Sequence, residues 1–157
     1  MSTSVNPEDE PLWRRRLGSG ANNRAWTLAE KIGRSAEDDQ EMLHAAHAAM
    51  HLWSTIGTAL NIARGQLLLG QVHALLGDAK YANEYATAAH DYFIANDTAP
   101  GELAFVHAVR ANAAHCCGDA ALHESSYRKA EALIASLANP GEREALQATM
   151  NVIPKPR

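Results

Sequence analysis

Three histidines, His44, His47 and His51, lie on one short stretch with only alanine and methionine between them. On an α-helix these three positions fall within roughly 60° of one another, so the imidazoles share one face. Imidazole is a common ligand of transition metals, but one helix seldom completes a metal site. A fourth ligand would have to come from another part of the chain. The residues of suitable chemistry there are His90, Asp91, His107 and His115.

The histidine face is also poor in charge. From Met42 to Leu76 the only charged residue is Arg64, although 20% of the whole chain is charged. A solvent-exposed helix face ordinarily carries charged side chains. The composition therefore favours a covered face, and we expect self-association through these helices. The alternatives are a face covered by the amino-terminal segment or a small ligand, plain solvent exposure, and a metal site at the three histidines.

The bulk composition limits the class of protein. The chain has 157 residues, the size of one domain, and its net charge of -4 argues against nucleic acid as the main ligand. It has no apolar run of about 18 residues and no apolar core of a signal peptide near its start. Cys116 and Cys117 are adjacent, so pairing them would strain the backbone, and free thiols are typical of a reducing compartment. We expect a cytoplasmic protein that binds neither nucleic acid nor a membrane.

The two ends differ from the rest of the chain. Residues 1–20 contain two prolines and two glycines without clear periodicity and are predicted to form a flexible N-terminal arm. Residues 151–157 contain two more prolines and are predicted to be an extended tail. Residues 21–150 have helical patterns throughout and form one all-α domain. The expected helices are 22–34, 37–56, 59–76, 79–95, 100–116, 120–137 and 140–150.

The breaks between these helices recur. Gly-Asp occurs at 77–78 and at 118–119, and Pro-Gly-Glu occurs at 100–102 and at 140–142. Both motifs return after about 40 residues, which is the period of a helix-turn-helix repeat. A helix pair of this size cannot bury its own apolar face, so stacked pairs must share one core.

The segment 69–89 resembles a tetratricopeptide repeat. Gly70 lies where that family has a small residue at the crossing of its two helices, and Gly77-Asp78 matches the turn between them. Ala82 and Ala89 match the small positions of the second helix.

Two further units are similar. From residue 103, Ala111 replaces the glycine and Gly118-Asp119 forms the turn; from about residue 22, alignment on Asp38 offers Met42, Ala46 and Ala49 at the small positions. The resemblance covers roughly residues 22–138, with a longer period than the family's and without its usual proline after the second helix. It implies a right-handed, helical-repeat superhelix of three antiparallel helix pairs, and the helix at 140–150 would cap its open end.

The resemblance also implies a binding surface. In that family the first helix of each pair lines a concave face that binds an extended peptide. The positions that carry over are Arg24, Thr27, Lys31 and Arg34 in the first unit, Arg64, Leu67 and Gln71 in the second, and Phe105, Ala108, Asn112 and His115 in the third. This set is mildly basic, which favours an acidic peptide or a chain-terminal carboxylate as the ligand.

The leading function is therefore a non-enzymatic protein-interaction module that binds a peptide or protein partner in this groove and self-associates, for example as a homodimer. We identify no catalytic residues and expect no cofactor. One alternative is a metal-binding helical protein or metal-dependent enzyme that holds a transition metal at His44, His47 and His51. Another is a sensor or regulatory domain that binds a small ligand between its helices.

Overall fold

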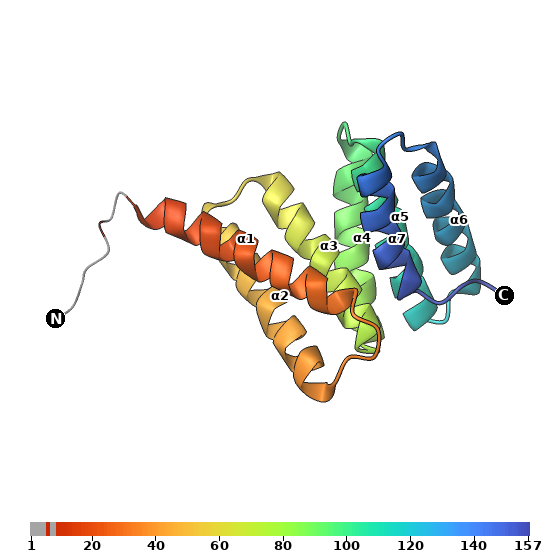
Figure 1. Cartoon of the computed structure of the whole chain (residues 1–157), viewed down its shortest axis with the longest axis horizontal. Helices are drawn as coiled ribbons and strands as arrows, with labels where there is room; N and C mark the ends of the chain where they lie inside the picture. Colours follow the sequence, from red (N-terminus) through yellow and green to blue (C-terminus); the bar gives the residue numbers. More distant parts are fainter. Residues whose placement is uncertain (1–5, 7–8) are drawn as a thin grey trace.

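The computed structural model describes residue 6 and residues 9–157, and its regular secondary structure is entirely helical (Figure 1). The helices are α1 (Glu10–Ala29), α2 (Ala36–Ile56), α3 (Ala59–Leu75), α4 (Ala79–Ala95), α5 (Pro100–Cys116), α6 (Ala120–Ser136) and α7 (Pro140–Asn151). The all-α prediction is confirmed for these residues, which contain no strand. Among the described helices, none combines the length and hydrophobicity needed to span a membrane.

The predicted bounds of the first helix are wrong. α1 begins at Glu10 and ends at Ala29, so a large part of the predicted flexible arm is helix. Residues 1–5 and 7–8 of that arm lie outside the described residues. Gly18, which suggested a break, is buried in α1, where a Cβ would come within 2.8 Å of Nε1 of Trp53 in α2. Close packing on α2 therefore outweighs the low helix propensity of glycine.

The other six helices begin and end within one residue of the predicted bounds. The predicted tail of residues 151–157 begins with the last residue of α7 and contains no further helix, and it packs on the domain. Ile153 is 4% exposed, and Nε2 of His123 lies 2.8 Å from the carbonyl oxygen of Pro154.

The turns of the second and third helix pairs are the same. Gly77 and Gly118 have φ angles of 77° and 76°, in the left-handed region that favours glycine. The aspartate that follows each glycine closes the preceding helix with a backbone hydrogen bond of 2.9 Å. Its carboxylate then accepts a hydrogen bond from the third residue of the next helix. The repeated Gly-Asp motif thus specifies both the end of one helix and the start of the next.

The helices pack as the pairs α1–α2, α3–α4 and α5–α6, and the first helices of the pairs also contact one another in order, with α7 next to α5 (Figure 1). Ten of the 17 residues of α3 are buried, as many as in α5. This burial accounts for much of the charge-poor stretch between Met42 and Leu76, because the chain itself covers α3.

Buried residues recur at matching positions in the second helix of each pair. They are Met42, Ala46, Ala49 and Trp53 in α2, Ala82, Ala86, Ala89 and Phe93 in α4, and His123, Tyr127, Ala130 and Ile134 in α6. In each set the third residue is alanine, which lets the paired helices approach closely. At the far end, α7 buries Leu146 and Met150 against α5 and α6 and covers the core there.

Candidate binding site

A cavity of about 480 Å³ lies between the first helices of the pairs. Its lining comes from α1, α2, α3, α5 and α7 and from the residues that cap α1 and α5. The lining residues are Asn22, Trp26, Glu30, Trp53, Arg64, Leu67, Ala99, Gly101, Glu102, Phe105 and Glu142. A cavity of this volume suits a small ligand or one or two side chains of a partner.

Aromatic side chains form much of the wall. The chain has three tryptophans and two phenylalanines, and Trp26, Trp53 and Phe105 all line this cavity. The rings of Trp26 and Phe105 lie 5.8 Å apart at an interplanar angle of 57°. Trp53 is 7% exposed and is fixed by its packing against Gly18. Such rings present apolar surface and a negative π-face to whatever enters.

Two of the cavity's charged groups neutralise each other. The guanidinium of Arg64 in α3 donates two hydrogen bonds to the carboxylate of Glu102 in α5, at 2.6 and 3.1 Å. This two-pronged geometry holds both side chains in a fixed orientation. It raises the pKa of Arg64, and the pair ties α3 to α5 at the cavity wall.

The other two carboxylates have no cationic partner among the described residues. Burial raises the pKa of Glu30, and a hydrogen bond of 3.0 Å from Oγ1 of Thr149 in α7 opposes this shift. Glu142 lies over the first turn of α5, where a Cβ on Gly101 would collide with its carboxylate. The free N–H groups at a helix amino terminus favour such a charge.

The structure brings Arg64, Leu67 and Phe105 of the predicted groove together at the cavity. Gln71 and Asn112 do not line it. Both are buried, and Nδ2 of Asn112 donates a hydrogen bond of 3.0 Å to Oε1 of Gln71. They occupy matching positions of α3 and α5 and join the second and third pairs. Ala108 is fully buried, and His115 lines a separate cavity of about 490 Å³ with His123 and Lys155.

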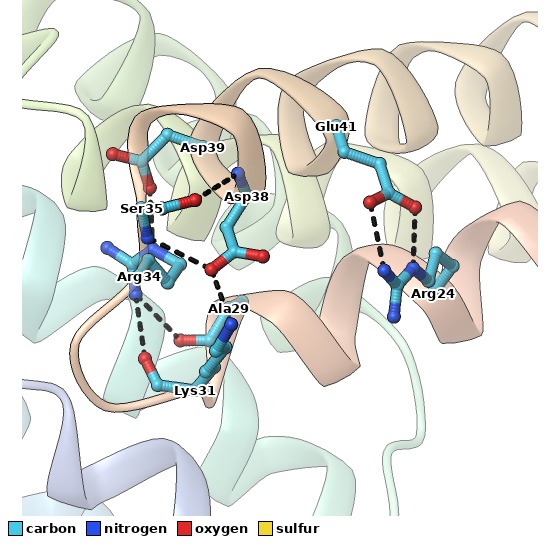
Figure 2. A network of polar contacts seen from close by, with 8 residues as sticks. All are labelled: Arg24, Ala29, Lys31, Arg34, Ser35, Asp38, Asp39 and Glu41. Atoms are coloured by element: carbon cyan, nitrogen blue, oxygen red, sulfur yellow. Dashed lines mark hydrogen bonds and ion pairs between the residues drawn. The ribbon is translucent and has the colours of Figure 1, made fainter.

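The predicted groove residues of the first unit make contacts within the first helix pair, and Figure 2 shows those of Arg24, Lys31 and Arg34. The guanidinium of Arg24 donates to both carboxylate oxygens of Glu41, at 2.6 and 2.9 Å. Lys31 donates to Asp38 at 2.5 Å, and Arg34 donates to Asp39 at 2.7 Å. The hydroxyl of Thr27 donates to the carbonyl oxygen of Asn23.

The cations predicted for the groove therefore do not gather at this cavity. The cations of the first unit are engaged with acidic residues of α2, and the cavity holds three carboxylates and one guanidinium. The physical reason is the placement of α1. The helix ends at Ala29, so Lys31 and Arg34 belong to the loop, and α1 turns Asn22 and Trp26 toward the cavity in place of Arg24 and Thr27.

Sequence reasoning missed Trp26, Trp53 and the three glutamates. A signal for two of the glutamates was present in the repeated Pro-Gly-Glu motif. It places Glu102 and Glu142 in the first turns of α5 and α7, and both line the cavity because these two helices pack side by side.

The histidine cluster lies on a different surface. His44, His47 and His51 are exposed on α2, and Met42 and Ala46 are among the residues buried on the opposite side of the helix. The ring of His47 lies edge-on to that of His73 in α3, with centroids 5.6 Å apart. Burial, then the charges of His73 and His44, lower the pKa of His47.

No group of three His, Cys, Asp or Glu side chains is arranged to hold a metal ion in the described part of the chain. A metal at His44, His47 and His51, and self-association through the exposed face of α2, stay predictions. In comparisons with known proteins, no family model, curated protein or solved structure matches the chain. The tetratricopeptide resemblance therefore rests on its residues and on the order of helix packing.

Proposed function

We propose that the chain is a non-enzymatic binding module with a tetratricopeptide-like architecture, a right-handed superhelix of three helix pairs closed by α7. Its binding site would be the cavity between α1, α3, α5 and α7, and its ligand a segment of a protein partner. The identical turns at Gly77 and Gly118 support the repeat, as does the hydrogen bond between the matching residues Gln71 and Asn112.

The cavity is the main support for this function. The first helices of all three pairs contribute to its lining, and in the resembled family these helices form the peptide-binding face. Its aromatic wall offers the kind of rigid, amphipathic surface that dominates binding energy at protein interfaces.

A blocking substitution tests the proposal. Peptides that bind the wild-type protein would be selected from a random library and measured against Ala99→Trp and Ala48→Trp by calorimetry. Both alanines are exposed, but Ala99 lines the cavity and Ala48 lies on the outer face of α2. Ala99 makes no side-chain cap to α5, so its replacement leaves the start of that helix intact.

We expect Ala99→Trp to weaken binding at least about tenfold, equal to about 1.4 kcal/mol, because its indole fills the cavity mouth. Ala48→Trp should bind like the wild type. The reverse pattern would place the binding surface on the histidine face of α2 and overturn the proposal.

A further inference from the structure

We infer that the group which enters this cavity is a cation, the ammonium group of a lysine side chain in the partner segment. The inference rests on the proposed function and names the chemistry of its ligand. It is opposite in charge to the acidic ligand that the mildly basic groove set of all three units favoured.

Charge complementarity is the first support. The cavity is lined by three glutamates and one arginine, and Arg64 is fully engaged by Glu102. Glu30 and Glu142 make no ion pair within the described residues. An anionic ligand would meet two unpaired carboxylates, whereas a cation would supply the partner that they lack.

The apolar and aromatic lining of the cavity is the second support for a lysine ligand. A lysine side chain is an apolar stem with a charged end, and both parts find a match here. Leu67 and the rings of Trp26 and Phe105 offer apolar surface for the methylenes. The ring faces also attract an ammonium group, and such attraction is stronger where water is excluded.

Gly101 shows how one of the carboxylates is held in place. Since a Cβ at this position would collide with the carboxylate of Glu142, the glycine leaves room for that group at the first turn of α5. The substitution Gly101→Ala would displace the end of a flexible side chain and leave the backbone in place. It therefore offers a way to move the carboxylate without removing it.

The test uses the full chain and three pentapeptides, acetylated and amidated so that they carry no terminal charge. Their central residue is lysine, its neutral analogue norleucine, or glutamate, between glycines and alanines. Binding is followed by NMR of the three tryptophan indole N–H signals. Trp26 and Trp53 line the cavity, and Trp13, which is 50% exposed elsewhere on α1, is the internal control.

We expect the lysine peptide to shift the signals of Trp26 and Trp53 and leave that of Trp13 unchanged. The norleucine peptide should bind about tenfold more weakly, and the glutamate peptide more weakly still. Glu142→Gln and Gly101→Ala should each reduce the affinity for the lysine peptide about fivefold, which is the upper range for one partly exposed ion pair. Glu144→Gln, an exposed residue of α7 outside the cavity, should have no effect.

The outcomes separate the two proposals. If the norleucine or glutamate peptide shifts the Trp26 and Trp53 signals as strongly as the lysine peptide, the cavity binds peptides and the cation inference is wrong. If none of the three peptides shifts these signals, peptide binding at the cavity fails together with the inference. If butylammonium binds as tightly as the lysine peptide, the ligand is a free amine, and the assignment to a protein segment is overturned.

Discussion

The first helix pair differs from the two that follow it. α3, α4, α5 and α6 each have 17 residues and are joined in pairs by the same Gly-Asp turn. α1 and α2 have 20 and 21 residues, and a longer loop held by the ion pairs of Lys31 and Arg34 connects them (Figure 2). The connection between paired helices thus depends on backbone geometry in two units and includes ion pairs of charged side chains in the first.

The two regions also use their charged side chains differently. In the first pair Arg24 of α1 and Lys31 and Arg34 of the loop each pair with an acidic residue of α2. In the later pairs Arg64 of α3 pairs with Glu102 of α5, and both side chains line the cavity. The two carboxylates of the cavity that make no ion pair within the described residues, Glu30 and Glu142, come from the end of α1 and from α7.

The crossing of α3 and α4 gives the largest expected effect. A Cβ on Gly70 would lie 3.0 Å from the backbone nitrogen of Ala86, so a larger side chain would force the helices apart. We expect Gly70→Leu to lower the free energy of unfolding by about 3 kcal/mol, measured by urea denaturation. Gly20→Leu in α1 is the matched control, since nothing lies within 4 Å of a Cβ there. Equal losses of unfolding free energy at the two sites would show that the loss at Gly70 does not come from the close crossing of α3 and α4.

The later helix pairs and the first helix pair should lose stability in different pH ranges. His107 in α5 is 6% exposed, and burial, then the charges of His90, Lys129 and Arg110, lower its pKa to about 4. The unfolded chain binds this proton near its ordinary pKa of 6.5, whereas the folded chain does not until pH falls to about 4. The contribution of this site to the free energy of unfolding is thus complete above pH 6.5 and decreases by about 3 kcal/mol as pH falls to 4. The variant His107→Leu should show a flatter profile in urea denaturation across this range.

The loop of the first pair should respond in another pH range. The hydrogen bond from Lys31, then that from the backbone of Ser35, lower the pKa of Asp38 below its ordinary value of 3.8. Its contribution is present above that value and is lost as pH falls further. Asp38→Asn should therefore change the profile only at the acid end. If the unfolding free energies of this variant and of His107→Leu changed with the same slope between pH 6.5 and 4, the two pH ranges would not be distinct.

The regular part of the fold was predictable because its signals are local. The Gly-Asp turns fix a left-handed glycine and an aspartate cap within a few residues, so the bounds of α3 to α6 follow from the sequence. The start of α1 was not predictable in this way. Its glycines indicate a break by local rules, and only the packing of Gly18 against Trp53, a residue far along the chain, shows why the helix continues.

The same distinction applies to the site. Arg64, Leu67 and Phe105 were predicted because matching positions of a repeat face the same side. Trp26 and Glu142 were not, since their places depend on the rotation of α1 about its axis and on the contact of α7 with α5. Both are long-range properties that no local pattern in one sequence specifies.

The smallest expected effect tests whether ion pairs hold the first pair together. Arg34 has a side chain that is 14% exposed and pairs with Asp39, whereas Arg24 pairs with Glu41 and is 49% exposed. We expect Arg34→Met to cost about 1 kcal/mol of unfolding free energy, and Arg24→Met to cause no measurable loss, because exposed pairs gain little in water. Urea denaturation at low and high salt provides the measurement, and the loss at Arg34 should persist at high salt since its pair is partly shielded from counterions. Equal effects of the two substitutions would show that the loop is held by its backbone, like the Gly-Asp turns, and the contrast between the helix pairs would then lie in length alone.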